Sequence, residues 1–95
     1  YGHRSDGPRN EVVKGLRAAG YSVIPNASSG GMGWERKGVP DLTIGGRRGM
    51  WYLEVKEAGG VLSPSQKDFH EHWRGPQILV AHSIEEALDM LGMGR

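Results

Sequence analysis

Residues 40–56 read PDLTIGGRRGMWYLEVK, and this stretch decides the fold. Two runs with strand character, residues 40–44 and 50–56, flank a short segment that holds three glycines and two arginines. Glycine tolerates the backbone conformations that tight turns require, and runs separated in this way are typical of a β-hairpin. The stretch therefore predicts two neighbouring antiparallel strands.

The turn fixes which residues of the two strands oppose each other. Opposed residues of an antiparallel pair have numbers of constant sum, so a turn centred on the two arginines places Asp41 opposite Glu54. The same register places Leu42 opposite Leu53. Because side chains alternate between the two faces of a strand, Asp41, Glu54 and Lys56 share one face and the other is apolar.

The polar face combines groups that are useful together in hydrolysis. Two carboxylates at close range raise each other's pKa unless a cation lies between them. Carboxylate oxygens suit Mg²⁺ or Mn²⁺, which also bind phosphate oxygens. Lys56 could orient the attacking water or stabilise charge that builds on a phosphate. A plain surface hairpin with a Glu-x-Lys pair is the alternative interpretation.

The pattern Pro40-Asp41, then Glu54-Val55-Lys56, resembles the signature of the PD-(D/E)xK nuclease superfamily. The resemblance continues in residues 59–66, Trp73, residues 78–80 and 83–88, and upstream in residues 11–13, Leu16 and residues 20–21. Together these segments resemble the VRR-Nuc branch, the virus-type replication-repair nucleases. The resemblance covers about residues 11–91, and residues 38–66 are its specific part.

The resemblance implies an α/β fold with a restriction-endonuclease-like core, in which helices flank a mixed central sheet. We expect the order α-β-β-β-α-β-α in one domain, residues 1–95. The sequence places these elements at residues 8–19, 21–24, 40–44 and 50–56, then in a helix opened by Ser63, a strand at 77–81 and a helix between Ser83 and Gly92. Residues 26–39 are expected to form a loop.

The resemblance also implies a metal site. Asp41, Glu54 and the main-chain carbonyl of Val55 would hold Mg²⁺, for which Mn²⁺ could substitute. Glu11 on the first helix would reach the ion directly or through water, and Glu35 is its rival. Glu11 could instead be a solvated carboxylate near a helix N-terminus, where acidic groups are favoured.

Gln66 has two possible roles. It matches the family's glutamine at the start of the second helix, where it would brace Lys56 or a phosphate. A capping box that begins at Ser63 also requires Glu or Gln at this position. Both roles stay open.

Loop residues are candidates for contact with DNA. The nucleic-acid-binding candidates are Ser28, Arg36, Lys37, Arg47 and Arg48, with the four basic residues expected beside the site; solvated loop charge is the alternative. Trp34 could stack on a base or pack over the core. We interpret the four histidines, including His70 and His72, as surface groups, because no third metal ligand accompanies them.

Composition narrows the function classes. The absence of cysteine excludes a disulfide framework and a thiolate metal site. No apolar run approaches the roughly 20 residues that span a bilayer, and no signal-peptide pattern opens the chain, so we expect no membrane association. Residues 1–50 carry eight Lys/Arg against four Asp/Glu (+4), and residues 51–95 carry four against seven (−3). A basic N-terminal half suits contact with phosphates.

The sequence thus predicts a Mg²⁺-dependent DNA endonuclease without an organic cofactor, in the cytoplasm of a bacterium or a phage-infected host. We expect selectivity for branched or four-way-junction DNA. The small core favours a homodimer. The alternative is a DNA-binding module on the same fold without catalysis.

Overall fold

The computed structural model describes residues 6–26 and 38–93. Their elements follow the expected order: α1 (Asp6–Ala18), β1 (Ser22–Pro25), β2 (Leu42–Gly46), β3 (Gly49–Val55), α2 (Pro64–His72), β4 (Gln77–Ala81) and α3 (Ile84–Met93). The predicted fold class, with three helices and a mixed sheet, is confirmed. No helix in these residues is long and apolar enough to cross a membrane.

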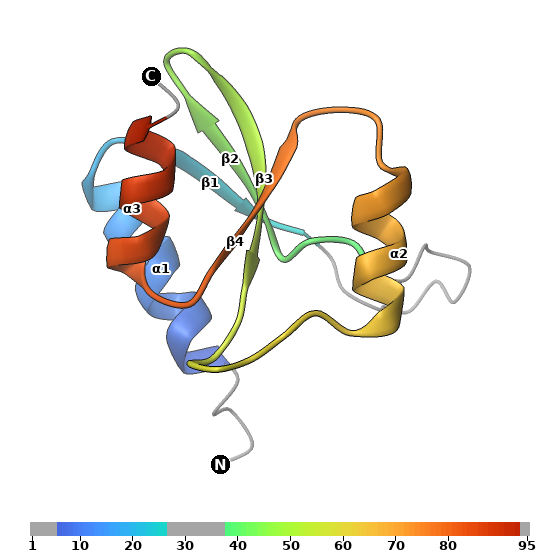
Figure 1. Ribbon diagram of the computed structural model, residues 1–95. Coiled ribbons are helices and arrows are strands. Elements are labelled where there is room, and N and C mark those ends of the chain that lie inside the picture. The colour runs from blue at the N-terminus through green and yellow to red at the C-terminus, as the bar shows by residue number, and fades with distance from the viewer. Residues whose placement is uncertain (1–5, 27–37, 94–95) are drawn as a thin grey trace.

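The four strands form one sheet in the order β1-β2-β3-β4. The first three are antiparallel neighbours, and β4 runs parallel to β3. A parallel pair needs a crossover connection, and here α2 lies within that connection. Figure 1 shows α1 and α3 together on one side of the sheet and α2 on the other side.

The hairpin has the predicted register, with Leu42 opposite Leu53 and Ile44 opposite Trp51. Regular pairing begins at Leu42, two residues later than predicted. The reason is local, because proline has no N–H to donate and the side chain of Asp41 takes the place of a main-chain partner for Val55.

The ends of α1, β1, β3 and α3 also differ from the sequence prediction by one or two residues. The first strand was predicted to end at residue 24, but Pro25 pairs with Leu42 as part of β1. Because β1 is an edge strand, a missing N–H is tolerated there. Helix α3 continues through Gly92 to Met93.

The main core lies between the sheet and the helices α1 and α3. It contains only aliphatic side chains: Val12, Leu16, Val23, Leu42, Ile44, Leu53, Leu79, Ala81, Ala87 and Leu91. Gly15 allows the two helices to approach closely, since a Cβ there would lie 2.5 Å from atoms of the Ile84 side chain. This layer holds the apolar face of the hairpin and turns its polar face toward α2.

Helix α2 covers the other face through aromatic side chains. Phe69 is buried and stacks on Trp73, and Trp73 packs against Tyr52 of β3, each pair with ring centroids 5.2 Å apart. Ser63 caps the helix in a capping box with Gln66, as the sequence predicts. These contacts hold the first turn of α2 over the polar end of the hairpin.

Candidate functional site

Asp41 is fixed at the entrance to β2 by contacts with two neighbouring strands. Its Oδ2 accepts a hydrogen bond from the backbone N–H of Val55 at 2.9 Å. Asn26, just after β1, donates its backbone N–H to the Asp41 carbonyl at 2.8 Å and its Nδ2 to the Pro40 carbonyl at 2.9 Å. Thr43 in turn donates its hydroxyl to Asn26 Oδ1. The carboxylate is therefore pre-positioned beside β3.

Glu54 is the one buried charged side chain among the described residues, with 2% of its surface exposed. Its pKa is raised from 4.5 to about 8, chiefly by burial and then by the hydrogen bond and the negative charge of Asp41. The positive charge of Lys56 acts in the opposite direction. With this pKa, Glu54 keeps its proton near neutral pH unless a cation is bound beside it.

Gln66 connects the second helix to this pair. Its Oε1 accepts from the backbone N–H of Ser63 at 2.8 Å, which completes the capping box. Its Nε2 donates to Glu54 Oε2 at 3.1 Å. The two interpretations of Gln66 therefore coexist in one side chain: it caps α2 and contacts a carboxylate of the site.

Lys56 follows β3 and lies near the site, since its charge acts on Glu54 and on His70 of α2. His70 is half-buried, so its interpretation as a surface group was wrong. Burial, and next the charge of Lys56, lower the pKa of His70. Its Nε2 is buried without a hydrogen-bond partner in the described residues. The signal in the sequence was the four-residue spacing from Gln66, which places both side chains on one helix face.

The donor set fits a hard divalent cation. Asp41 and Glu54 supply carboxylate oxygens, and Glu54 Oε1 is buried without a hydrogen-bond partner in the part of the chain that the structure describes. An ion there would supply the missing interaction and offset the burial and the repulsion from Asp41 that raise the pKa of Glu54. Residues 6–26 and 38–93 hold no group of three or more His, Asp or Glu side chains arranged for a metal. The fit is therefore to an ion such as Mg²⁺, which needs only one or two carboxylates and keeps several waters.

Glu11 does not join the two carboxylates in such a group. It is exposed on α1, on the side of the sheet opposite α2, and lines a surface pocket with Lys14, His82 and Glu85. His82 is itself engaged, with Nδ1 2.8 Å from Glu86 Oε1 and Nε2 3.1 Å from the Gly60 carbonyl. The proposed part of Glu11 in the metal site stays a prediction.

Arg47 and Arg48 do not lie beside the carboxylates, so this expectation was wrong. They form the turn between β2 and β3, at the opposite end of the hairpin from Asp41 and Glu54. Arg47 follows Asp41 by six positions of extended chain, which is about 20 Å. The arginines are close to Asp41 in sequence, but the extended strand β2 separates them from it in space. The remaining loop candidates, Ser28, Trp34, Glu35, Arg36 and Lys37, lie outside the described residues.

Comparisons with known proteins agree with this architecture. No family model matches the sequence, and no curated protein matches it. A solved structure described as a "VRR_NUC domain" matches with 27% sequence identity and a TM-score of 0.68, over 88% of this chain and 89% of that chain. The resemblance found in the sequence is thereby confirmed in three dimensions.

Proposed function

With the fold of a VRR-Nuc domain as the premise, we propose that this chain is a metal-dependent nuclease that hydrolyses phosphodiester bonds of DNA. The observation that carries the proposal is the buried carboxylate of Glu54 beside Asp41, with Lys56 two residues further along. Burial of an ionisable carboxyl group costs free energy, and a purely structural role for Glu54 would give no evident return for it. Strongly perturbed pKa values concentrate at functional sites.

The metal-binding residues in this proposal are Asp41, Glu54 and the main-chain carbonyl of Val55. Mg²⁺ is the ion expected, with Mn²⁺ as a substitute, because both prefer oxygen ligands. When bound, the ion supplies Lewis-acid stabilisation of the negative charge that develops on the phosphate oxygens. Glu11 is a candidate for contact through water.

The remaining roles belong to side chains around this pair. Lys56 positions the attacking water and balances negative charge at the scissile phosphate. Gln66 holds one oxygen of Glu54, which leaves the other oxygen available to bind a cation. The N–H of Val55 holds Asp41 in the same way. Both carboxylates are thereby oriented before substrate arrives, which lowers the reorganisation needed for catalysis.

Finer features of the function are also proposals. We expect the substrate to be branched DNA such as a four-way junction, in phage or bacterial replication, repair or recombination. A homodimer would place two sites in antiparallel relation, as the two strands of a duplex require. Light scattering at micromolar concentration, with and without junction DNA, measures this; a mass near 10 kDa throughout, with full activity, would exclude the dimer.

The decisive experiment incubates the protein with linear, nicked, flapped and four-way-junction DNA in Mg²⁺, in Mn²⁺ and in chelator. We expect cleavage in either metal and none in chelator. Lys56→Ala should lower the rate at least 100-fold while DNA binding persists, because the metal ligands and the other basic residues remain. Lys67→Ala is the matched control, since it removes an exposed lysine from α2 and should leave the rate unchanged.

Two outcomes would contradict the proposal. Cleavage by Lys56→Ala at the wild-type rate would refute the role of Lys56. Binding of DNA by the wild-type protein without cleavage in either metal, on any substrate, would favour the alternative of a non-catalytic DNA-binding module.

A further inference from the structure

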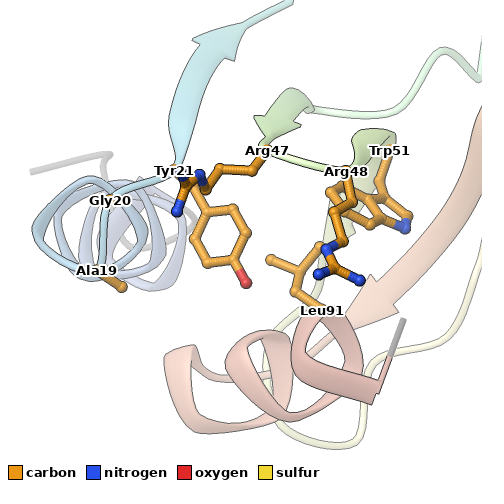
Figure 2. Close-up of a pocket in the computed structure, with 8 residues that line it drawn as sticks. Ala19, Gly20, Tyr21, Arg47, Arg48, Trp51 and Leu91 are labelled. Carbon is orange, nitrogen blue, oxygen red and sulfur yellow. The ribbon is translucent and has the colours of Figure 1, made fainter. Parts of the chain in front are cut away.

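A second hollow lies at the far end of the hairpin from the carboxylates. It is about 610 Å³ in volume and is lined by Ala19, Gly20, Tyr21, Gly46, Arg47, Arg48, Trp51 and Leu91. These residues come from the segment between α1 and β1, from the β2–β3 turn and the adjoining parts of both strands, and from α3. Figure 2 shows the Tyr21 ring between α1 and the turn, with Arg47 extending toward Tyr21 and Arg48 toward Leu91. We refer to it as the turn pocket.

Two aromatic rings form part of its wall because Gly46 has no side chain. A Cβ at Gly46 would lie 3.1 Å from the ring of Trp51 and 3.3 Å from that of Tyr21. Any other residue would thus crowd the rings from the strand between them. Both rings are partly buried against the core, and the glycine leaves their remaining surface open beside a rim that carries positive charge.

The two arginines supply this rim. Both side chains are exposed, and neither forms an ion pair within residues 6–26 and 38–93. No carboxylate lines the turn pocket. A guanidinium is permanently charged, and its fork of N–H donors matches a phosphate. The pocket therefore combines two features of sites for single nucleic-acid strands, namely aromatic rings on which bases stack and cations that hold the backbone.

We infer that the turn pocket is a second contact point for nucleic acid, in which Arg47 and Arg48 each bind a backbone phosphate while a base packs on Tyr21 or Trp51. This assignment rests on the proposed nuclease function and extends it to the substrate. The pocket lies about 20 Å from the carboxylates, or about six base pairs along a duplex axis. It would anchor an arm of the substrate away from the bond that is cut.

Binding of fluorescently labelled DNA, measured by anisotropy in chelator over a range of salt concentrations, tests the pocket without catalysis. Arg47→Ala/Arg48→Ala should weaken binding about tenfold or more and reduce the slope of log K against log[salt] by about two, one for each lost phosphate contact. Arg74→Ala, an exposed arginine after α2, is the control and should leave the slope unchanged. Arg47→Lys/Arg48→Lys keeps the charge and should retain most of the slope.

A second measurement tests the aromatic wall. The probe is a DNA duplex with a single-stranded overhang. Abasic positions in the overhang keep its phosphates but remove the bases that could stack. The abasic probe should bind the wild-type protein several-fold more weakly than the intact probe. Gly46→Ala should reduce this difference, because the added methyl group displaces the rings. Melting curves of each variant establish that it remains folded.

The outcomes separate this inference from the proposed function. If the wild-type protein binds DNA but never cuts it, the nuclease function is refuted. The arginine variants still test whether DNA binds at the turn pocket. Wild-type affinity and salt slope in Arg47→Ala/Arg48→Ala would overturn the pocket even if cleavage is intact. A change in self-association by light scattering, with DNA binding unaltered, would identify a protein interface instead and would also overturn it.

Discussion

The two ends of one hairpin carry opposite charges in opposite environments. At one end Asp41 and Glu54 lie under α2, and Glu54 is almost completely excluded from water. At the other end Arg47 and Arg48 are exposed at a turn that no helix covers. Water screens the arginines, so they contribute little to the stability of the fold and stay accessible to a charged partner. The covering helix changes the protonation of the acidic end, and so makes it a candidate for chemistry.

Glu54→Gln should have the largest effect and should show how burial perturbs the acidic end. The unfolded carboxyl group loses its proton near pH 4.5, whereas the folded one keeps it until about pH 8. The folded state therefore binds more protons between these values, and the metal-free protein should lose stability as pH rises. The loss is about 1.4 kcal/mol per pH unit, or about 4 kcal/mol between pH 5 and 8.

Urea unfolding in chelator at several pH values measures this dependence. Glu54→Gln should remove most of it, making the variant more stable than the wild type at pH 8 although it no longer cleaves DNA. Divalent metal should restore wild-type stability at high pH and have little effect on the variant. A wild-type stability that does not change with pH would contradict the burial argument.

Gly38→Ala is expected to detach the chain before Asp41 from α2. A Cβ at Gly38 would lie 2.2 Å from the Ser65 carbonyl oxygen, and the backbone has a φ of +87°. Gly59→Ala is the matched control, because Gly59 also has a positive φ, of +79°, but open space around it. We expect Gly59→Ala to cost about 1 kcal/mol in unfolding free energy and Gly38→Ala about 2–3 kcal/mol more. Equal losses of unfolding free energy in the two variants would show that α2 shifts to accommodate the added methyl group.

Gln66→Glu separates the two contacts of Gln66. A glutamate can still accept the Ser63 N–H, so the cap on α2 and the melting temperature should be retained. It cannot donate to Glu54, and it adds a negative charge beside it. We expect the cleavage rate to fall about tenfold, equivalent to about 1.4 kcal/mol in the barrier. A lower melting temperature with an unchanged rate would leave Gln66 as a cap only.

His70 should have a smaller effect on the rate. Its buried Nε2 lacks a partner in the described residues, and Lys56 is a nearby donor that could supply one during the reaction. His70→Phe should lower the rate a few-fold, and His70→Gln should recover part of it because Gln retains an acceptor. His72→Phe, on an exposed part of the same helix, is the control. Equal effects at both positions would assign the loss to helix stability.

The smallest effect should come from the arginine end. Arg47→Ala/Arg48→Ala should change the free energy of unfolding by less than about 0.5 kcal/mol, because both side chains are exposed. Thermal melting at low and high salt measures it. A larger loss of unfolding free energy would mean that the two arginines make stabilising contacts despite their exposure.

Local patterns in the sequence were enough to predict the hairpin. The glycine-rich turn and the alternation of Leu53 with Glu54 select one register, because a shift by one residue would turn the apolar face to the solvent. The capping box at Ser63 and Gln66 was predictable for the same reason, since all its atoms lie within four residues. Such features need no knowledge of the rest of the fold.

Contacts between distant segments were harder to predict. Asn26 holds both Pro40 and Asp41 across 14 and 15 residues, and nothing in its immediate sequence indicates this. His70 reaches the site because the crossover places α2 over β3. Arg47 lies far from Asp41 because β2 runs between them in extended conformation. In each case the missing information was the path of the chain between elements.

The parallel pairing of β3 with β4 has a consequence for the order of folding. The β2–β3 hairpin closes through a two-residue turn, and such hairpins form in about 1–10 μs. Pairing of β3 with β4 must wait until residues 56–76 have crossed the sheet, which costs more loop entropy and is slower. We therefore expect Asp41 and Glu54 to meet while both are still hydrated and ionised. Docking of α2 is then the step at which the chain must take up a proton or a cation, and divalent metal should speed this late phase of refolding at neutral pH.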